Sequence, residues 1–370
     1  MVSAFGNIYR GKRVLVTGHT GFKGGWLSLW LHSLGAEVSG FSLPPTGGDN
    51  FFSVLPENCF ARSTLADLRE ARAINQAVAE AQPDVIFHLA AQPIVGVSYR
   101  DPLGTITTNA LGSALLLEAV RNANSAAAVL VVTSDKCYRN DGSGRPFIES
   151  DPLGGHDVYS MSKAATEMVV AAWHSSFFSK EPGLGPLATG RAGNVIGGGD
   201  YAEDRIIPDA VRAYEKKQTL KLRRPQATRP WQHVLESVSG YLALARQMLA
   251  EPDRTQLLNF NFGPEFESER TVQELMDAWL ASWPAAFDMQ VSPEPAYEEV
   301  TRLNLDHTKA KRDLGWLPVW NFHEAVSRTA EWYRLRHEER RDNAAMLAVT
   351  LDQIASYTKA ASSAGAAWTT

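Results

Sequence analysis

Two groups of polar residues have the types and the spacing for proton transfer. Ser134, Asp135 and Lys136 directly follow the apolar run AAVLVVT (127–133), which places a hydroxyl, an acid and an amine at the end of a buried strand. Tyr159 and Lys163 in YSMSK are four residues apart and therefore share one face of a helix. A lysine beside a tyrosine stabilises the phenolate and brings the phenol's pKa down from about 10 towards the range of a working base.

A glycine-rich turn has the spacing of a nucleotide-binding motif. Gly18, Gly21 and Gly24 in VTGHTGFKGGW have G-x-x-G-x-x-G spacing between an expected strand and an expected helix. Glycine allows the tight turn and lets a pyrophosphate approach the backbone N–H groups at the helix N-terminus, so the motif predicts a dinucleotide site. The second strand is followed by Ser42, with neither an acid for a ribose 2′-hydroxyl nor an arginine for a 2′-phosphate. We expect NAD rather than NADP.

The elements that must position these groups alternate along the chain. Apolar, β-branched runs at 12–18, 37–43, 84–91, 127–134 and 185–198 predict strands, and helical periodicity fills 24–36, 68–82, 105–123 and 158–177. This alternation predicts an α/β protein of the Rossmann type, a doubly wound parallel sheet with helices on both faces. The tryptophans of WLSLWL and His88 in IFHLA are expected to be core residues.

The pattern loosens in the second half of the chain. We expect an NAD-binding domain at 1–198 and a smaller, mostly helical substrate-binding lobe at 199–370, interleaved with the first. Within this lobe the sequence predicts a loop at 197–210, isolated strands at 257–264 and 297–306, and a frayed tail at 358–370.

Composition narrows the class of protein. The 370 residues carry 36 Lys and Arg against 41 Asp and Glu, and the net charge of -5 without a basic block disfavours nucleic acid as a partner. Cys59 and Cys137 are too few for a disulfide framework or a metal knuckle, so no metal site is expected. Without a signal-like start or 18 consecutive apolar residues, we expect a soluble, cytoplasmic protein with no membrane partner.

Several motifs together resemble a known family. TGHTGFKG, FHLAAQP, TNALGS, VTSDKCY, YSMSK, RAGNVIGGGD, IIPD, TRPWQHV and KAKRDLGW resemble the extended short-chain dehydrogenase/reductases, and within them the nucleotide-sugar 4,6-dehydratases, over about residues 10–335. The likeness is greatest to members that act on CDP-D-glucose. It implies a hydro-lyase with NAD as cofactor and CDP-D-glucose as substrate. It also implies a homodimer formed through two long helices, and a role in deoxysugar biosynthesis for surface polysaccharide such as lipopolysaccharide O-antigen.

The resemblance also implies roles for the catalytic candidates. Tyr159, assisted by Lys163, takes the proton of the sugar's 4-hydroxyl, which Ser134 also binds, while hydride passes from carbon 4 to NAD. Asp135 protonates the departing 6-hydroxyl as water is lost across carbons 5 and 6, and the hydride returns to carbon 6.

Lys136 stands where most relatives have the glutamate that removes the proton from carbon 5. A free lysine is protonated at neutral pH, so Lys136 must first lose its proton to act as that base, which is our prediction. The alternative is a charged Lys136 that only stabilises the developing enolate.

Two further sets of contacts are carried over from the resemblance. Asp67 and Leu68 are expected beside the adenine, and a phosphate-binding role suits arginine because its planar fork binds oxygens bidentately. The expected cofactor contacts are Gly18, Thr20, Gly21, Phe22, Lys23, Gly24, Asp67, Leu68, Leu89, Ala90, Ala91, Gln92, Asn109, Tyr159 and Lys163. The expected substrate contacts are Ser134, Asn194, Arg205, Arg229 and Arg302. For Asn109, helix capping or contact with solvent is an equal alternative.

Other functions stay open at this point. One is a 4,6-dehydratase or a 4-epimerase for another nucleotide sugar, although an acid at Asp135 beside a strand-end hydroxyl argues against simple epimerisation. Another, from a different class, is a non-catalytic dinucleotide-sensing protein. Such a protein has no need of Ser134, Tyr159 and Lys163 together.

Overall fold

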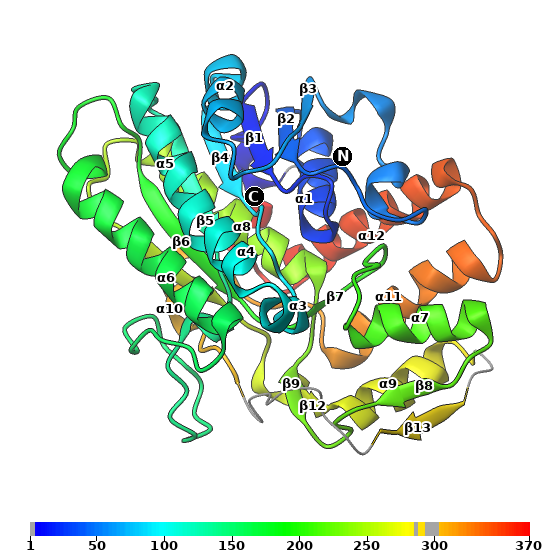
Figure 1. Cartoon of the computed structure of the whole chain (residues 1–370). Helices are drawn as coiled ribbons and strands as arrows, with labels where there is room; N and C mark the ends of the chain where they lie inside the picture. The colour runs from blue at the N-terminus through cyan, green and yellow to red at the C-terminus, as the bar shows by residue number, and fades with distance from the viewer. Residues whose placement is uncertain (1–3, 285–287, 293–302) are drawn as a thin grey trace.

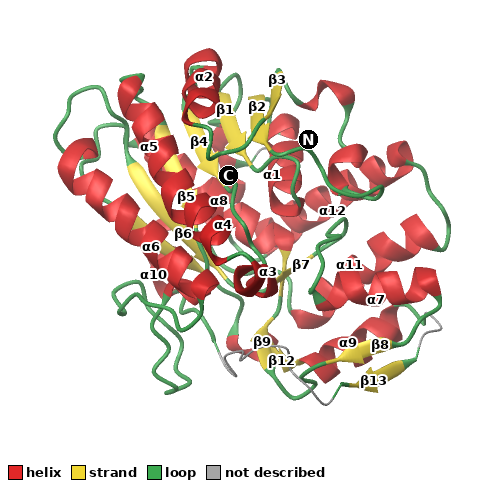
Figure 2. Ribbon diagram, viewed as in Figure 1, coloured by secondary structure: helices red, strands yellow, loops and turns green. Residues whose placement is uncertain are grey.

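A parallel sheet with helices on both faces forms the centre of the molecule. The computed structural model describes residues 4–284, 288–292 and 303–370. Within these residues seven strands pair in the order β11-β6-β5-β4-β1-β2-β3, all parallel (Figures 1 and 2). Their bounds are β1 Arg13–Thr17, β2 Glu37–Ser42, β3 Arg62–Leu65, β4 Val85–His88, β5 Ala128–Val132, β6 Leu187–Ala192 and β11 Leu258–Phe262. The Rossmann-type prediction is confirmed.

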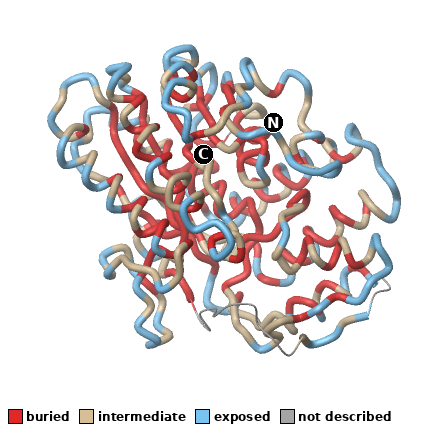
Figure 3. The backbone as a smooth tube through the Cα atoms, viewed as in Figure 1, coloured by how far each residue is buried: buried red, intermediate tan, exposed pale blue. Residues whose placement is uncertain are grey.

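Alternate residues of the strands feed two separate apolar layers. On β1, Val14 and Val16 belong to one buried cluster and Leu15 to the other, because successive side chains of a strand point to opposite faces. The first layer contains α1 Phe22–Ser33 and α8 Val234–Ala250, and the second contains α2 Ala71–Ala81, α5 Gly112–Asn122 and α6 Val158–Trp173. The central strands are therefore buried on both sides, and the backbone tube of Figure 3 is mostly red through the middle of the molecule, whereas the edge strand β3 is largely exposed.

The tryptophans predicted to be core residues are in the core. Trp26 and Trp30 of α1 are fully buried, and the Trp26 indole N–H donates to the carbonyl of Gly198 (2.9 Å). His88 is buried too, with Nδ1 2.7 Å from Thr17 Oγ1 and Nε2 3.0 Å from Ser113 Oγ. These two contacts satisfy both ring nitrogens.

Some elements beyond residue 198 belong to the main sheet and its helices, and others lie outside it. The run at 257–264, expected to be an isolated strand, is β11 at the edge of the main sheet, where it pairs with β6; that prediction is wrong. The loop expected at 197–210 ends early because α7 Ile206–Lys216 begins inside it. Of the strand expected at 297–306, positions 297–302 lie outside the described residues, and Leu305 forms a bridge with Phe147.

The remaining elements lie outside the main sheet, and several of them form a smaller group at the lower right of Figure 1. Three two-stranded ladders join β7 to β10, β8 to β13 and β9 to β12. The strand bounds are β7 Val195–Ile196, β8 Leu220–Leu222, β9 Thr228–Pro230, β10 Gln232–His233, β12 Glu269–Thr271 and β13 Met289–Val291. The helix bounds are α3 Val95–Arg100, α4 Pro102–Ile106, α9 Val272–Ser282, α10 Thr308–Leu314, α11 Phe322–His337 and α12 Asn343–Ser363.

The C-terminal tail is docked rather than frayed, so that prediction is wrong. Helix α12 continues to Ser363, and Trp368 beyond it is fully buried, stacked on Phe5 with 4.8 Å between ring centroids. The carbonyl of Thr370 accepts a hydrogen bond from the amide of Gly6 (2.9 Å). Burial of a large aromatic ring provides the free energy that orders this small-residue segment.

The stretch Pro102–Asn122 is long and apolar enough to cross a membrane, and it is the one such helix in the part of the chain that the structure describes. Half of its most apolar window is buried inside the protein. Core helices of globular proteins have the same composition, so this is weak evidence for a membrane span.

Candidate active site

The glycine turn has the close backbone packing that a dinucleotide site requires. Gly18 follows β1 with φ +78°, and a Cβ there would lie 2.8 Å from the amide nitrogen of Ala90. A Cβ on Gly24 would lie 2.0 Å from the carbonyl oxygen of Gly18. Only glycine fits either position.

The start of α1 leaves its first amides for a ligand. The N-cap residue is Gly21, and no side chain caps the helix there, so the N–H groups of the first turn, at Phe22, Lys23 and Gly24, point out of the helix end. Together with the helix dipole they suit a pyrophosphate. The cradle therefore fits the diphosphate of NAD.

The loop after β4 lies next to the glycine turn, at the carboxyl ends of the strands. The amide of Ala90 donates to Thr17 Oγ1 (3.2 Å), and the amide of Gln92 donates to Asn109 Oδ1 (2.8 Å). Asn109 Nδ2 donates onward to Ser162 Oγ (2.8 Å), next to Lys163 on α6. The expected cofactor residues 89–92 and Asn109 are thus linked to the helix that bears the Tyr–Lys pair. Asn109 is buried in this link and makes no side-chain cap.

The residues expected around the adenosine are neutral or paired. Thr20 Oγ1 lies 2.8 Å from Ser42 Oγ at the end of β2, so two hydroxyls occupy the place where an acid would bind the ribose. Asp67 accepts hydrogen bonds from Arg69, which lower its pKa. Leu68 is buried, and its Cδ2 would touch a Cβ on Gly112 (2.7 Å).

The strand-end triad is held by its own short turn. Ser134 caps the turn Asp135–Cys137 by accepting from the Lys136 amide (3.2 Å), and its hydroxyl donates to Asp135 Oδ1 (2.8 Å). Burial raises the pKa of Asp135, while the charge of Lys136 and the Ser134 hydrogen bond lower it. Gly193 leaves room for this acid, since a Cβ there would lie 2.8 Å from Asp135 Oδ2.

Tyr159 and Lys163 are both buried on one face of α6. Burial raises the pKa of Tyr159 to about 12, and the Arg205 charge and a hydrogen bond with Ser134 act in the opposite direction. Burial lowers the pKa of Lys163 to about 8, opposed by Cys137 and Glu167. Ser134, Asp135, Tyr159 and Lys163 therefore come together at the carboxyl ends of the strands, and Lys136 lies half-buried beside Asp135.

An ion pair beneath this group was missed in the sequence. Glu167 of α6 binds Arg191 of β6 (2.7 Å), and both side chains are buried. Glu167 also accepts from Thr133 (2.5 Å) and Thr189 (2.9 Å), so one carboxylate joins α6 to β5 and β6. The signal was present, since an arginine inside the apolar strand 187–192 needs a buried partner.

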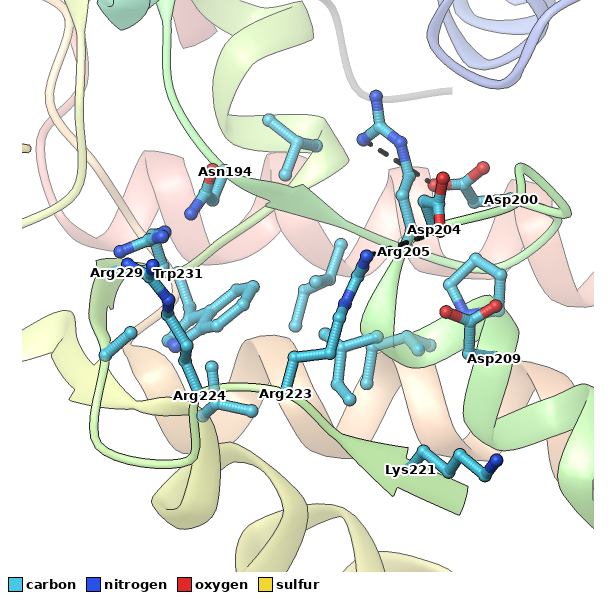
Figure 4. Close-up of a pocket in the computed structure, with 18 residues that line it drawn as sticks. Asn194, Asp200, Asp204, Arg205, Asp209, Lys221, Arg223, Arg224, Arg229 and Trp231 are labelled. Atoms are coloured by element: carbon cyan, nitrogen blue, oxygen red, sulfur yellow. Dashed lines mark hydrogen bonds and ion pairs between the residues drawn. The ribbon is translucent and has the colours of Figure 1, made fainter. Parts of the chain in front are cut away.

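A pocket, drawn in Figure 4, opens near the catalytic group, because its lining residues Arg205 and Arg229 lower the pKa of Tyr159 and of Asp135 respectively. It lies among the segment 194–200, α7, and the chain from β8 to β9, and it is lined by several cations. These are Arg205, Lys221, Arg223, Arg224 and Arg229. Asn194, Arg205 and Arg229 were predicted to bind substrate and do line it, while Arg302 lies outside the described residues. Lys221, Arg223 and Arg224 were missed, although KLRRPQATR is visibly basic.

Carboxylates accompany the pocket cations. Asp200 lies 3.8 Å from Arg205, and Asp204 lies 3.5 Å from Arg223. These separations exceed the 2.7–2.9 Å typical of strong charge-assisted hydrogen bonds, so a phosphate can compete for the guanidinium groups. Lys23 extends the cationic region towards the glycine turn, and burial together with the Arg205 charge lowers its pKa to about 7.

Comparison with known proteins identifies the family. A family model described as GDP-mannose 4,6 dehydratase matches residues 15–329. The CDP-glucose 4,6-dehydratase of Salmonella typhimurium is 41% identical over 332 residues, covering 89% of this chain and 92% of that protein. The dTDP-glucose 4,6-dehydratase of Xanthomonas campestris pv. campestris is 27% identical over 337 residues, covering 86% of this chain and 92% of that protein.

A solved structure supports the same grouping. DesIV, a dTDP-glucose 4,6-dehydratase from Streptomyces venezuelae crystallised with NAD bound, superposes with a TM-score of 0.76 at 26% identity, covering 88% of this chain and 98% of that chain. The chain belongs to the GDP-mannose 4,6-dehydratase family of nucleotide-sugar dehydratases, within the extended short-chain dehydrogenase/reductases.

Proposed function

We propose that the protein catalyses the NAD-dependent dehydration of CDP-D-glucose to CDP-4-dehydro-6-deoxy-D-glucose. The observation that carries this proposal is the meeting of Ser134, Asp135, Tyr159 and Lys163 beside a cation-lined pocket. The choice of CDP-glucose over other nucleotide sugars is supported by the 41% identical relative, which is named for that substrate.

The chain's own residues divide the work of the reaction. The glycine turn and the first amides of α1 would hold NAD, which would supply a reversible hydride acceptor for carbon 4 and carbon 6. Tyr159 removes the 4-hydroxyl proton, and the Arg205 cation stabilises its phenolate. Lys163, four residues later on the same helical face, is proposed as a second stabilising cation. Ser134 orients that hydroxyl, and Asp135, whose pKa is raised by burial, protonates the departing 6-hydroxyl. Lys136 removes the proton from carbon 5.

The pocket supplies the binding energy and the position of the substrate. Arg205 and Arg229 neutralise the diphosphate, and Asn194 lies at the end of the pocket nearest the sugar. We further propose that residues 1–198 bind NAD and that 199–370 mainly bind substrate, with α8 and β11 interleaved into the first part. The described residues contain no group of three His, Cys, Asp or Glu side chains placed for a metal ion.

We also propose a cytoplasmic homodimer that supplies deoxysugars for surface polysaccharide. The support for the dimer is an apolar face on the helices that flank the sheet. Leu103 is 73% exposed, Leu111 51% and Met168 65%, on α4, the turn before α5, and α6. Apolar side chains this exposed and this close in the fold favour a protein interface.

The test is to incubate the purified protein with NAD and CDP-glucose and to measure the alkali-induced absorbance of a 4-keto sugar. We expect product from CDP-glucose, and much less from GDP-, UDP- and dTDP-sugars. Tyr159→Phe should abolish it, while Tyr214→Phe, at a half-buried tyrosine packed on Trp283, should not. Cofactor binding without product from any sugar would instead favour the dinucleotide-sensing alternative, and an epimer without water loss would favour an epimerase.

A further inference from the structure

The pocket has a reacting end and a far end. Asn194 and Arg229 lie at the reacting end, where a Cβ on Gly193 would lie 2.8 Å from Asp135 Oδ2 and the Arg229 charge lowers the pKa of that acid. Figure 4 shows Asp209 and Lys221 on the opposite side of the pocket, with Arg223 and the backbone of Arg205 between the two ends.

This order of groups matches the order of parts in a sugar nucleotide. If the sugar reacts beside Asp135, as the proposed function requires, the diphosphate lies among the arginines in the middle. The base then reaches the end formed by α7 and β8. The inference below rests on that proposed function.

Asp209 is the carboxylate built into this far end. It lies half-buried in the first turn of α7, and Arg212, one helical turn later, donates to its Oδ1. Arg212 also donates to the carbonyls of Tyr201 (3.0 Å) and Ala202 (3.1 Å), so its guanidinium is fixed. Burial raises the pKa of Asp209, and the ion pair with Arg212 opposes that effect by favouring the ionised carboxylate. Its Oδ2 is left as an acceptor for a ligand.

The neighbouring carboxylate, Asp204, is placed differently. Its Oδ1 lies 3.5 Å from Arg223 and its Oδ2 lies 3.8 Å from Arg100, so both oxygens face cations. Asp204 also has φ +60°, a left-handed conformation that is uncommon for aspartate and fixes its position in the loop before α7. Asp204 therefore orients the cations, and Asp209 is the acceptor available to a base.

We propose that Asp209 selects cytosine over uracil and thymine in the nucleotide by accepting a hydrogen bond from the exocyclic amino group. Cytosine carries an amino donor at carbon 4, where uracil and thymine carry a carbonyl oxygen. An ionised carboxylate attracts the amino group and repels the carbonyl, so one residue both favours the correct base and disfavours the others.

The experiment is to measure CDP, UDP and dTDP binding by titration calorimetry for the wild type, Asp209→Asn and Asp204→Asn, with NAD binding as a check of folding. An asparagine amide can turn to donate to a carbonyl, so Asp209→Asn should reduce the preference for CDP over UDP and dTDP by roughly 5- to 150-fold, the equivalent of about 1–3 kcal/mol of base discrimination. Asp204→Asn removes one carboxylate charge from the same end of the pocket, next to Arg223 and Arg100, and should change all three affinities alike, leaving the preference intact.

The outcomes separate the inference from the proposed function. A wild type that prefers CDP, together with an Asp209→Asn variant that keeps the same preference, would overturn the role of Asp209 and leave the proposed substrate standing. An equal loss of preference in Asp204→Asn would also overturn it, because the effect would then be one of charge alone. A wild type without preference for CDP would contradict the proposed substrate itself.

Discussion

At the scale of single residues, Lys136 is the group whose role most affects the mechanism. It follows Asp135 in one short turn, and its charge opposes the effect of burial on the pKa of that acid. We predict that Lys136→Met still oxidises carbon 4, because Tyr159, Lys163 and the cofactor cradle are unchanged. Dehydration should collapse, because the proton at carbon 5 then has no base.

Single-turnover mixing with substrate measures both steps. NADH absorbance should appear and persist, and deuterium from heavy water should no longer enter carbon 5. Lys136→Arg keeps the charge without a usable base, and so separates proton removal from electrostatic stabilisation of the enolate. Product formation by Lys136→Met at close to the wild-type rate would remove this residue from the mechanism.

Arg205 is predicted to control the ionisation of Tyr159 as well as substrate binding. Its cation stabilises the phenolate and so lowers a pKa that burial has raised to about 12. In Arg205→Gln that pKa should rise further, because the phenolate loses a neighbouring cation. The rate of carbon 4 oxidation at saturating substrate should then increase only at higher pH than in the wild type. At neutral pH the rate should fall about tenfold each time this pKa rises by one.

The pH profile of single-turnover NADH formation checks this prediction. Arg205→Lys retains a charge and should show a smaller displacement of the profile, while Arg224→Gln, another arginine of the same pocket, should weaken binding without moving the profile. Superimposable profiles for Arg205→Gln and the wild type would contradict the proposed coupling.

At the scale of elements, α4, α5 and α6 present an apolar face that lacks cover from the described chain. Leu103, Leu111 and Met168 are more than half exposed on it, and half of the most apolar window of Pro102–Asn122 is buried inside the protein. We predict that Met168→Glu converts a dimer into a monomer, because a charge would then be buried in the interface.

Light scattering at micromolar concentration gives the molecular mass and so distinguishes a dimer from a monomer. Leu351→Glu on α12 is the matched control, since Leu351 is also an exposed apolar side chain (37% exposed) but lies on another part of the molecule. That variant should keep the wild-type mass. A wild-type protein with the mass of one chain would refute the proposed dimer.

At the scale of the whole molecule, Glu236 joins three distant segments. This buried residue of α8 accepts hydrogen bonds from the amides of Val319 (3.1 Å) and Trp320 (2.7 Å) and from the Tyr357 hydroxyl of α12 (2.6 Å). Burial raises its pKa to about 7, and these hydrogen bonds act in the opposite direction. The folded protein therefore holds this proton at pH values where the unfolded chain has released it.

Glu236 should make the protein less stable as pH rises. Its contribution is complete below the unfolded pKa of 4.5 and is lost as pH rises to about 7, at about 1.4 kcal/mol per pH unit. We predict that Glu236→Gln removes this dependence, because an amide stays neutral and can still accept from Trp320 and donate to Tyr357. Its stability relative to the wild type should increase by roughly 3 kcal/mol over that window.

Urea unfolding followed by tryptophan fluorescence at several pH values between 4.5 and 8 measures this difference. Glu251→Gln removes an exposed carboxylate that is paired with Arg254. The free energy of unfolding of this control should change with pH as that of the wild type does. If the free energy of unfolding of Glu236→Gln shows the same pH dependence as the wild type, the wild-type Glu236 carboxyl group holds no excess proton in the folded state.

The sequence alone determined the features that depend on neighbouring residues. The turn at Gly18–Gly24, the hydroxyl and acid at the end of β5, and the Tyr159–Lys163 spacing were all read correctly as local geometry, because backbone sterics and helical or strand periodicity fix them within a few residues. The parallel sheet followed as well, since alternating strands and helices can bury their apolar faces in few other ways.

Only the tertiary structure decided which distant segments meet. It placed β11 beside β6, docked Trp368 on Phe5, set Arg205 near Tyr159, and brought Arg223 of the β8–β9 segment into the pocket of Asn194. For each of these contacts, many other apolar or charged segments of the chain could have been the partner. The contact stabilises the fold only when the rest of the core excludes water around it. The local sequence of either partner carries no record of that competition.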